Sequence, residues 1–175
     1  MLQIRRATET DATIIALLGR VTFSESHEHF IADKKEFQAY LNKAFAIEKI
    51  KAELKDTNNL FWLVFKNDFP VGYSKLVINS LSEFLDFDKV CRLERIYILN
   101  DFLHLKIGNQ LQELVFKKAK ELQFNWIWLT VYAKNRIAVN FYEKNNYKEV
   151  GIINFYIGKV RYVKQGVLPV KSTSY

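Results

Sequence analysis

The order of the apolar segments is the feature that most restricts how this chain folds. Dense apolar runs of strand length lie at residues 60–65, 71–78, 90–99, 126–132, 150–157 and 160–168. Helical patterns separate only some of these runs, at 107–122 and 136–144. Strands joined by short turns pair antiparallel, whereas a strand–helix–strand unit crosses over to a parallel neighbour. We therefore expect an α/β domain with a mixed sheet.

The N-terminal part is expected to add a strand and three helices. A short strand is predicted at residues 4–7, and Thr8 or Thr10 can cap a helix that runs from about Asp11 to Phe23. Two further helices are predicted at 34–41 and 46–54. The polar segment between Phe23 and Asp33 is expected to be irregular.

Composition excludes several classes of protein. The chain has 175 residues, 49% of them apolar, with only two prolines and six glycines, so it can bury a large core and is neither disordered nor collagen-like. The single Cys91 excludes a disulfide framework and a multi-cysteine metal site, and fits a reducing compartment. Without a membrane-spanning run or a signal-peptide pattern, the chain is expected to be cytoplasmic and to bind no membrane.

Positive charge is concentrated in the second half of the chain. Residues 1–94 carry 13 basic and 14 acidic side chains, whereas residues 95–175 carry 13 basic and 5 acidic ones. The second half is therefore expected to bind an anion. No nucleic-acid partner is expected, because no stacking motif or recognition-helix pattern accompanies the charge.

A strand followed by a helix start forms the first segment of chemical interest. The strand around Leu93–Leu99 leads through a loop to Lys106 and Gly108, where a long helix begins. The unpaired N–H groups of a helix start favour a phosphate, and glycine lets one approach the backbone closely. A glycine in the first turn of a helix more often serves local packing, and the loop matches neither a P-loop nor a dinucleotide fingerprint.

The second segment is a capped helix that follows the strand at 126–132. Asn135 can cap this helix, and Ala138, Phe141 and Tyr142 share one of its faces. By itself this pattern is typical of an aromatic pair that faces the core.

Together the two segments resemble the GNAT superfamily of acetyl-CoA-dependent N-acetyltransferases. The family pattern is a Leu-x-x-Ile-x-Val strand, then Gln/Arg-x-x-Gly-x-Gly/Ala at a helix start, then Asn-x-x-Ala-x-x-Phe-Tyr-x-x-x-Gly-Phe. Residues 93–147 follow this order and spacing, and the opening at 4–11 and the hairpin at 70–73 also fit. Within the superfamily, Phe23 and the segments 40–45 and 93–98 resemble the PaiA-type polyamine acetyltransferases, which act on spermidine and spermine.

The resemblance implies an overall architecture. It implies one domain with a mixed, mostly antiparallel, twisted sheet of about seven strands, flanked by about four to five helices. It places the amine acceptor on the N-terminal half, residues 1–89, and acetyl-CoA on the basic half, residues 90–175. Homodimers are common in the family, so a homodimer is expected.

The resemblance also implies where acetyl-CoA binds. The strands at 96–98 and 129–132 would splay apart, and the backbone of 96–98 would pair with the pantetheine arm and supply an oxyanion-hole N–H. The amides of 105–109 would hold the pyrophosphate. The cofactor residues implied in this way are Ile96, Tyr97, Ile98, Leu103, His104, Leu105, Lys106, Ile107, Gly108, Asn109, Asn135, Ala138, Tyr142 and Lys144.

Three positions depart from the family pattern. Leu103 stands where the family has Gln or Arg, Lys106 replaces the first glycine, and Asn146-Tyr147 replaces Gly-Phe. A left-handed Lys106 would cost roughly 1–2 kcal/mol, which pairing with the pyrophosphate would offset. These departures leave open a degenerate, non-catalytic module that only binds acetyl-CoA.

The family's catalytic roles map onto two residues. Tyr142 occupies the general-acid position and would protonate the leaving thiolate. Glu94 is the best candidate for the base, directly or through a water. The alternative is that Glu94 only pairs with Arg92 or Arg95.

The acceptor is expected to be a small amine or a polyamine. Glu94 is the first candidate for contact with it, followed by Glu25 and Glu28, and the acidic loop at 80–88 would also suit a cation. A protein or peptide N-terminus is the alternative acceptor. No metal is expected at the His-rich stretch 25–29, because the reaction needs none and surface loops often have this composition.

Overall fold

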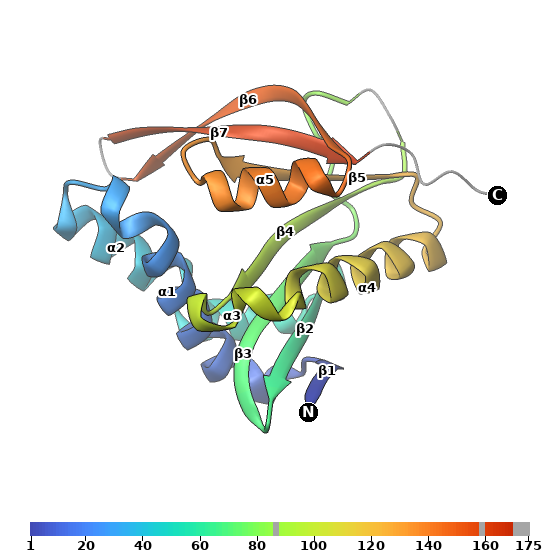
Figure 1. Ribbon diagram of the computed structural model, residues 1–175, viewed down its shortest axis with the longest axis horizontal. Coiled ribbons are helices and arrows are strands. Elements are labelled where there is room, and N and C mark those ends of the chain that lie inside the picture. The colour runs from blue at the N-terminus through green and yellow to red at the C-terminus, as the bar shows by residue number, and fades with distance from the viewer. Residues whose placement is uncertain (86–87, 158–159, 170–175) are drawn as a thin grey trace.

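A twisted seven-stranded sheet forms the centre of the protein (Figure 1). The computed structural model describes residues 1–85, 88–157 and 160–169, the last of these ranges by its backbone alone. The strands are β1 (Leu2–Arg6), β2 (Asn59–Lys66), β3 (Phe69–Val77), β4 (Val90–Ile98), β5 (Trp126–Tyr132), β6 (Tyr147–Ile157) and β7 (Val160–Pro169). Their order in the sheet is β1-β2-β3-β4-β5-β7-β6, and the β4–β5 pair alone is parallel among the pairs described.

Helices cover both faces of this sheet (Figure 1). One face is covered by α4 (Ile107–Glu121) and α5 (Arg136–Lys144), and the other by α1 (Ala12–His27), α2 (Lys34–Ala44) and α3 (Ile47–Lys55). Short 3-10 helices lie at Glu9–Asp11, Glu28–Phe30 and Asn100–Leu105. The predicted mixed, mostly antiparallel sheet with flanking helices is thereby confirmed.

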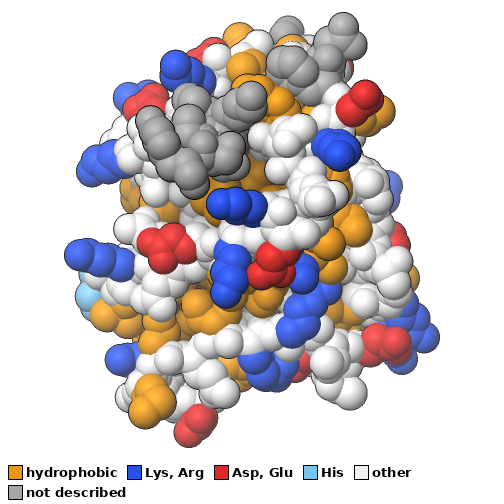
Figure 2. Space-filling model, turned by 90° about the vertical axis from the view of Figure 1, so that its right-hand side faces the viewer, with side chains coloured by type: hydrophobic (Ala, Val, Ile, Leu, Met, Phe, Trp, Pro, Cys, Tyr) orange, Lys and Arg blue, Asp and Glu red, His pale blue; other side chains and the backbone are white. Residues whose placement is uncertain are grey.

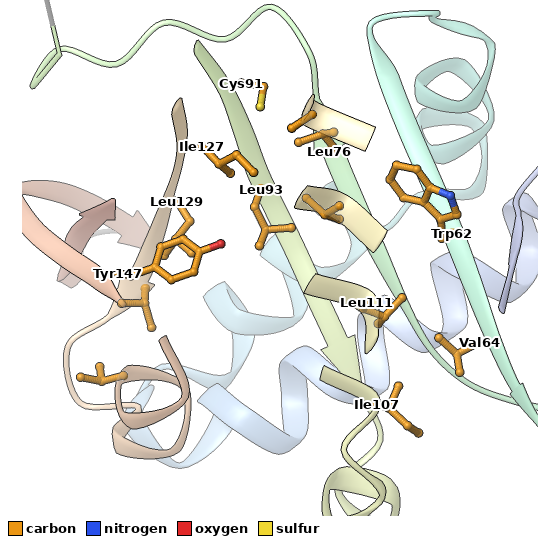
Figure 3. Close-up of a cluster of buried hydrophobic side chains, with 14 of the residues drawn as sticks. Trp62, Val64, Leu76, Cys91, Leu93, Ile107, Leu111, Ile127, Leu129 and Tyr147 are labelled. Atoms are coloured by element: carbon orange, nitrogen blue, oxygen red, sulfur yellow. The ribbon is translucent and has the colours of Figure 1, made fainter. Parts of the chain in front are cut away.

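The main hydrophobic core lies between the sheet and the α4/α5 face (Figure 3). Ile107 and Leu111 of α4 are fully buried in the same cluster as Leu93 of β4 and Leu129 of β5. Cys91 is also fully buried there. Burial of this apolar stripe explains why the period of 107–122 predicts the helix so closely.

A second core lies under α1 and α3 on the opposite face. Ile15 and Ile50 of these helices are fully buried with Leu63 and Tyr73 of the sheet. Next to it, an aromatic group joins α1, α2 and the ends of β5 and β6, and includes Phe23, Phe37, Phe45, Tyr132 and Phe155.

One extra residue in β4 changes the faces of this strand. Arg95 lies opposite Lys75 of β3 and Leu93 lies opposite Leu76, so Glu94 is a bulge. Before the bulge, Leu93 points into the core beneath α4, and after it Ile96 does so. Glu94 and Arg95 consequently both face the α1–α3 side, where they meet charged groups of β3 and α3.

The parallel strands β4 and β5 stay together for only part of their length. Their pairing runs from Val90–Trp126 to Arg92–Trp128, and from Leu129 onward β5 pairs with β7 instead. Beyond Arg92 the two strands diverge, as Figure 3 shows on either side of Leu93 and Leu129. The strands at 96–98 and 129–132 are thus separated, as the family resemblance implies.

The expectation of an irregular segment after Phe23 is wrong, because α1 continues to His27 and a 3-10 turn follows. Thr22 and Ser26 donate their hydroxyls to carbonyls in the preceding turn, which accommodates polar residues inside the helix. The rings of Phe23 and His27, four residues apart, stack with centroids 4.1 Å apart. This stack extends the buried face of α1 by one turn.

The other boundaries differ by a few residues at most, except that β6 starts at Tyr147 rather than 150 and the segment 100–105 forms a 3-10 helix. Within the described residues, no helix is long and apolar enough to cross a membrane.

Gly19→Ala is expected to destabilise the fold. A Cβ at this position would lie 2.4 Å from Cδ1 of Phe45 and 2.9 Å from the hydroxyl of Tyr73. Overpacking of this kind typically lowers the free energy of unfolding by about 1–3 kcal/mol, which urea denaturation measures. Leu17→Ala on the same helix is the control, because this side chain is 58% exposed and its loss should change stability by about 0.5 kcal/mol or less. Equal stability of the two variants would contradict the packing argument.

Candidate active site

The segment before α4 forms an exposed, basic helix start. The 3-10 helix Asn100–Leu105 ends at Lys106, which has φ 55° and ψ 24° and is therefore left-handed. Leu103, His104, Lys106 and Asn109 are exposed. No side chain of the described residues caps this helix, so its first N–H groups are available to a ligand.

Gly108 brings three elements of the expected site together. A Cβ on Gly108 would lie 3.1 Å from the ring of Phe141 on α5 and 3.7 Å from Cδ1 of Ile98 at the end of β4. The small residue therefore permits close contact between α4, α5 and β4. Phe141 fills the space that a side chain at position 108 would occupy, so Gly108 has a direct role in packing.

Helix α5 begins at the predicted cap. The Oδ1 atom of Asn135 accepts a hydrogen bond from the backbone N–H of Ala138, at 3.1 Å. Ala138 and Tyr142 pack against the main core, and Lys144 is exposed at the far end of the helix. The shared face predicted for Ala138 and Tyr142 is thus turned toward the sheet.

Two tyrosines lie near the divergence of β4 and β5. The ring centroid of Tyr142 is 5.3 Å from that of Tyr147, the first residue of β6. In Figure 3, Tyr147 projects across the space between Leu129 and Leu93. Its hydroxyl is buried and finds no hydrogen-bond partner in the described part of the chain. Burial raises the pKa of both phenols above the usual value, so both keep their protons at neutral pH.

A charged network covers the opposite face of the sheet at the same divergence. Lys75 of β3 contacts Glu94 of β4 and lies 3.0 Å from Glu53 of α3, and Arg95 lies 3.5 Å from Glu53. The side chains of Lys75 and Arg95 are only 5% and 10% exposed. The network therefore places mostly buried charges between α3 and the bulged strand.

The environment of Glu94 decides its protonation. Burial alone would raise the pKa of Glu94, but Arg95, Lys75 and Arg92 lower it below its usual value. Glu94 is therefore a carboxylate throughout the physiological pH range. Its pairing with Arg95 and Arg92, the alternative open at the level of sequence, is observed at 3.9 and 4.0 Å, while the contact with Lys75 is closer.

The two other acidic candidates bind parts of the protein itself. A carboxylate oxygen of Glu25 accepts the backbone N–H of Asn100 at 3.0 Å, which ties α1 to the segment before α4. Glu28 pairs with Lys34 at 3.2 Å. Both residues lie at the end of α1, far from Glu94 in the sequence. Asp86, which belongs to the acidic loop at 80–88, lies outside the described residues.

Sequence reasoning missed Lys75 and Glu53, and it gave no site role to Arg92 and Tyr147. Lys75 is a charged residue inside the otherwise apolar strand β3, a pattern that signals a buried ionic partner. The partner itself depends on the position of α3 and the register at Glu94, which sequence does not reveal. Figure 2 shows that basic side chains are spread over an entire face of the molecule with acidic ones beside several of them, so charge alone does not mark the site.

Comparison with known proteins identifies the family. A sequence model of the acetyltransferase (GNAT) family matches residues 22–147. The chain is 28% identical over 143 residues to an N-acetyltransferase of Lactobacillus delbrueckii subsp. lactis, covering 80% of each chain. It is 26% identical over 161 residues to an N-alpha-acetyltransferase of Sulfurisphaera tokodaii, covering 88% of this chain and 84% of the relative.

The fold has a solved counterpart with a bound coenzyme. The PaiA N-acetyltransferase of Thermoplasma acidophilum in complex with coenzyme A superposes with a TM-score of 0.75 and 19% identity, over 94% of this chain and 98% of that one. The chain belongs to the acetyltransferase (GNAT) family. It is an acetyl-CoA-dependent N-acetyltransferase.

The residues present fit acetyl-CoA. Within the described residues, the divergence of β4 and β5 leaves one edge of β4 without a strand partner beyond Arg92, and the hydroxyl of Tyr147 is buried there without a hydrogen bond. The uncapped amides and the basic Lys106 at the start of α4 suit an anionic pyrophosphate. These three features lie along the elements from which the family resemblance draws its cofactor residues.

Lys106→Gly is expected to stabilise the fold and weaken coenzyme binding. Glycine removes left-handed strain of about 1–2 kcal/mol. It also gives the unfolded chain more conformational freedom, which offsets part of this gain, so the free energy of unfolding should rise by up to about 1 kcal/mol. Loss of the ammonium should raise the Kd for coenzyme A by about 2–5-fold, as for an exposed ion pair.

Urea denaturation and calorimetric titration measure the two effects of Lys106→Gly. Lys117→Ala removes the same charge from an exposed position in the middle of α4 and should leave the Kd unchanged. An unchanged Kd for Lys106→Gly would show that Lys106 does not contact the coenzyme.

Proposed function

We propose that this protein transfers the acetyl group of acetyl-CoA to the primary amine of a small molecule by direct attack. The observation that carries the proposal is the pair of opposed groups at the divergence of β4 and β5: protonated Tyr142 on the α4/α5 face and ionised Glu94 on the α1–α3 face.

Acetyl-CoA, when bound, supplies the acetyl thioester. The backbone of Ile96, Tyr97 and Ile98 would hold the pantetheine arm as an added strand, and an N–H of this segment would stabilise negative charge on the thioester oxygen. The amides of 105–109 would bind the pyrophosphate, and Leu103 and His104 would flank it. Asn135, Ala138 and Lys144 would line the pantetheine arm and the nucleotide end.

Tyr142 is proposed as the general acid. A phenol that keeps its proton at neutral pH can donate it to the leaving thiolate. Tyr142 belongs to the core cluster that contains Leu93 and Leu129, the first residues beyond the last β4–β5 pair. This placement supports contact with the sulfur of a thioester bound between the strands.

Glu94 is proposed as the group that receives the proton of the amine, directly or through a water. Its lowered pKa makes it a weak base, so its stronger contribution is to attract and orient the ammonium form of the acceptor. Glu25 and Glu28 are further candidates for acceptor contact, although Glu25 also accepts the backbone N–H of Asn100 and Glu28 also pairs with Lys34.

Polyamines and peptide N-termini are the two acceptor classes suggested by similarity. The resemblance of Phe23 and the segments 40–45 and 93–98 to PaiA-type polyamine acetyltransferases supports the first, and the relative named N-alpha-acetyltransferase supports the second. A homodimer stays a prediction.

The first test combines binding and turnover. We expect acetyl-CoA to bind in calorimetric titration, and free thiol to be released when primary amines, including spermidine and spermine, are added. Binding without thiol release from any amine or peptide would contradict the enzymatic proposal and favour a non-catalytic module that binds acetyl-CoA. Absence of binding would contradict the cofactor site.

Tyr142→Phe is expected to lower kcat by about 10–10³-fold, the usual contribution of a general acid, while leaving the melting temperature nearly unchanged. Tyr156→Phe, at a position 56% exposed on β6, is the control and should retain full activity. Thiol-release kinetics at saturating acetyl-CoA check both variants. If Tyr142→Phe turns over at the normal rate, Tyr142 is not the acid, and the buried hydroxyl of Tyr147 becomes the group to test.

A further inference from the structure

The cation that the charged network leaves uncompensated is Arg92. Three mostly buried cations, Lys75, Arg92 and Arg95, share two carboxylates, Glu53 and Glu94, among the described residues. Exposed Lys49 adds a further positive charge at 3.6 Å from Glu53. The network therefore carries an excess of positive charge.

Contacts assign this excess to Arg92 rather than Arg95. Arg95 lies 3.5 Å from Glu53 and 3.9 Å from Glu94, so two carboxylates compensate this guanidinium. Burial lowers the pKa of Arg92, and Glu94 only partly opposes the effect. Among the described residues, the carboxylate paired with Arg92 is that of Glu94, and it lies 4.0 Å away, too far for a hydrogen bond.

The guanidinium of Arg92 is held in place but largely free to bind. It lies over the ring of Trp128 with its central carbon 4.7 Å from the ring centroid, and one Nη donates to the hydroxyl of Thr130 at 3.4 Å. Its Nε is buried and has no hydrogen-bond partner among the residues that the structure describes. Stacking on Trp128 fixes the plane of the guanidinium, as planar recognition of a carboxylate requires.

Position makes this free cation relevant to the acceptor. Arg92 and Trp128 form the last pair before β4 and β5 diverge, and Glu94 is two residues further along β4. Both side chains face the α1–α3 side, opposite the core that contains Tyr142. An anion-binding and a cation-binding group therefore stand side by side where the proposed amine would approach the thioester.

We propose that the acceptor is a small amine that also carries a carboxylate, as an amino acid does, with its carboxylate bound by Arg92 and its ammonium by Glu94. This inference rests on the proposed acetyl transfer and names its substrate class. A polyamine lacks the group that Arg92 requires and adds positive charge to a network that already has an excess. The carboxylate could come from a free amino acid or from the side chain or C-terminus of a short peptide.

The test compares amino acids with their α-amides, which lack the free carboxylate, and adds acidic dipeptides and spermidine for comparison. Free amino acids, their α-amides, acidic dipeptides and spermidine are assayed by thiol release at saturating acetyl-CoA. We expect kcat/KM for the amino acids to exceed that for their amides by about 10–100-fold, the contribution of a charge-assisted hydrogen bond. A preference for acidic dipeptides over free amino acids would identify the peptide as the source of the carboxylate.

Variants locate the effect at Arg92. Arg92→Gln should abolish the preference for the carboxylate, so that kcat/KM for the amino acids falls to that for their amides in the same variant, and Arg92→Lys should retain part of the preference. Arg6→Gln is the matched control, because Arg6 also lies over a tryptophan, Trp62, at 4.9 Å, but on the edge strand β1. This control should keep the full preference.

Two readouts separate this inference from the proposed function. Calorimetric titration of N-acetyl amino acids into the protein loaded with coenzyme A measures carboxylate binding without turnover, and binding should weaken about 10-fold or more in Arg92→Gln. Equal turnover of amino acids and amides, a best rate with spermidine, or product binding unaffected by Arg92→Gln would each overturn the assignment. Turnover only with amines that lack a carboxylate would leave the proposed acetyl transfer supported and refute only the carboxylate site.

Discussion

The fold depends on a hydrogen-bonding constraint at the centre of the sheet. Backbone N–H and C=O groups inside a protein must find partners, yet β4 and β5 stop pairing after Arg92 and Trp128. From there β4 relies on β3, and β5 on β7. The sheet thus contains a built-in divergence whose inner edge can be completed by a ligand with a strand-like arm. The helices α4 and α5 close one face of this divergence, and the charged network of β3, β4 and α3 lies on the other.

The bulge at Glu94 separates two kinds of chemistry along one strand. On the α4/α5 face, β4 presents Cys91, Leu93, Ile96 and Ile98 to an apolar core with buried phenols. On the other face it presents Arg92, Glu94 and Arg95 to Lys75 and Glu53. A proton donor that burial keeps neutral and a carboxylate that cations keep ionised thereby occupy opposite faces of the same divergence. A mixed sheet without the bulge would send Arg95 into the apolar side.

Local signals predicted most of the fold, whereas the cofactor residues follow from the family resemblance and stay a prediction. The strand at 126–132 and the helix at 136–144 were predicted with their observed boundaries, because apolar periodicity and the Asn135 cap are properties of neighbouring residues. The end of α1 was not predicted, because the stack of Phe23 on His27 compensates for a polar composition. The ionic network was not predicted either, since it needs α3 to lie over β3 and a one-residue shift in β4. Tertiary placement, not residue type, decides which charges meet.

The bulge also bears on how such an enzyme can change its substrate over evolutionary time. In a regular strand, side chains alternate between the two faces, so each residue that contacts a substrate lies between two residues that pack in the core. In β4 the residues at 92, 94 and 95 lie together on the side away from α4, while those at 91, 93, 96 and 98 maintain the core. Mutation can therefore explore new charge patterns at three adjacent sites without altering the apolar positions that hold α4. Deletion of a single residue at the bulge, in contrast, would restore regular alternation, which keeps the core positions in place and removes one charged position from the other side.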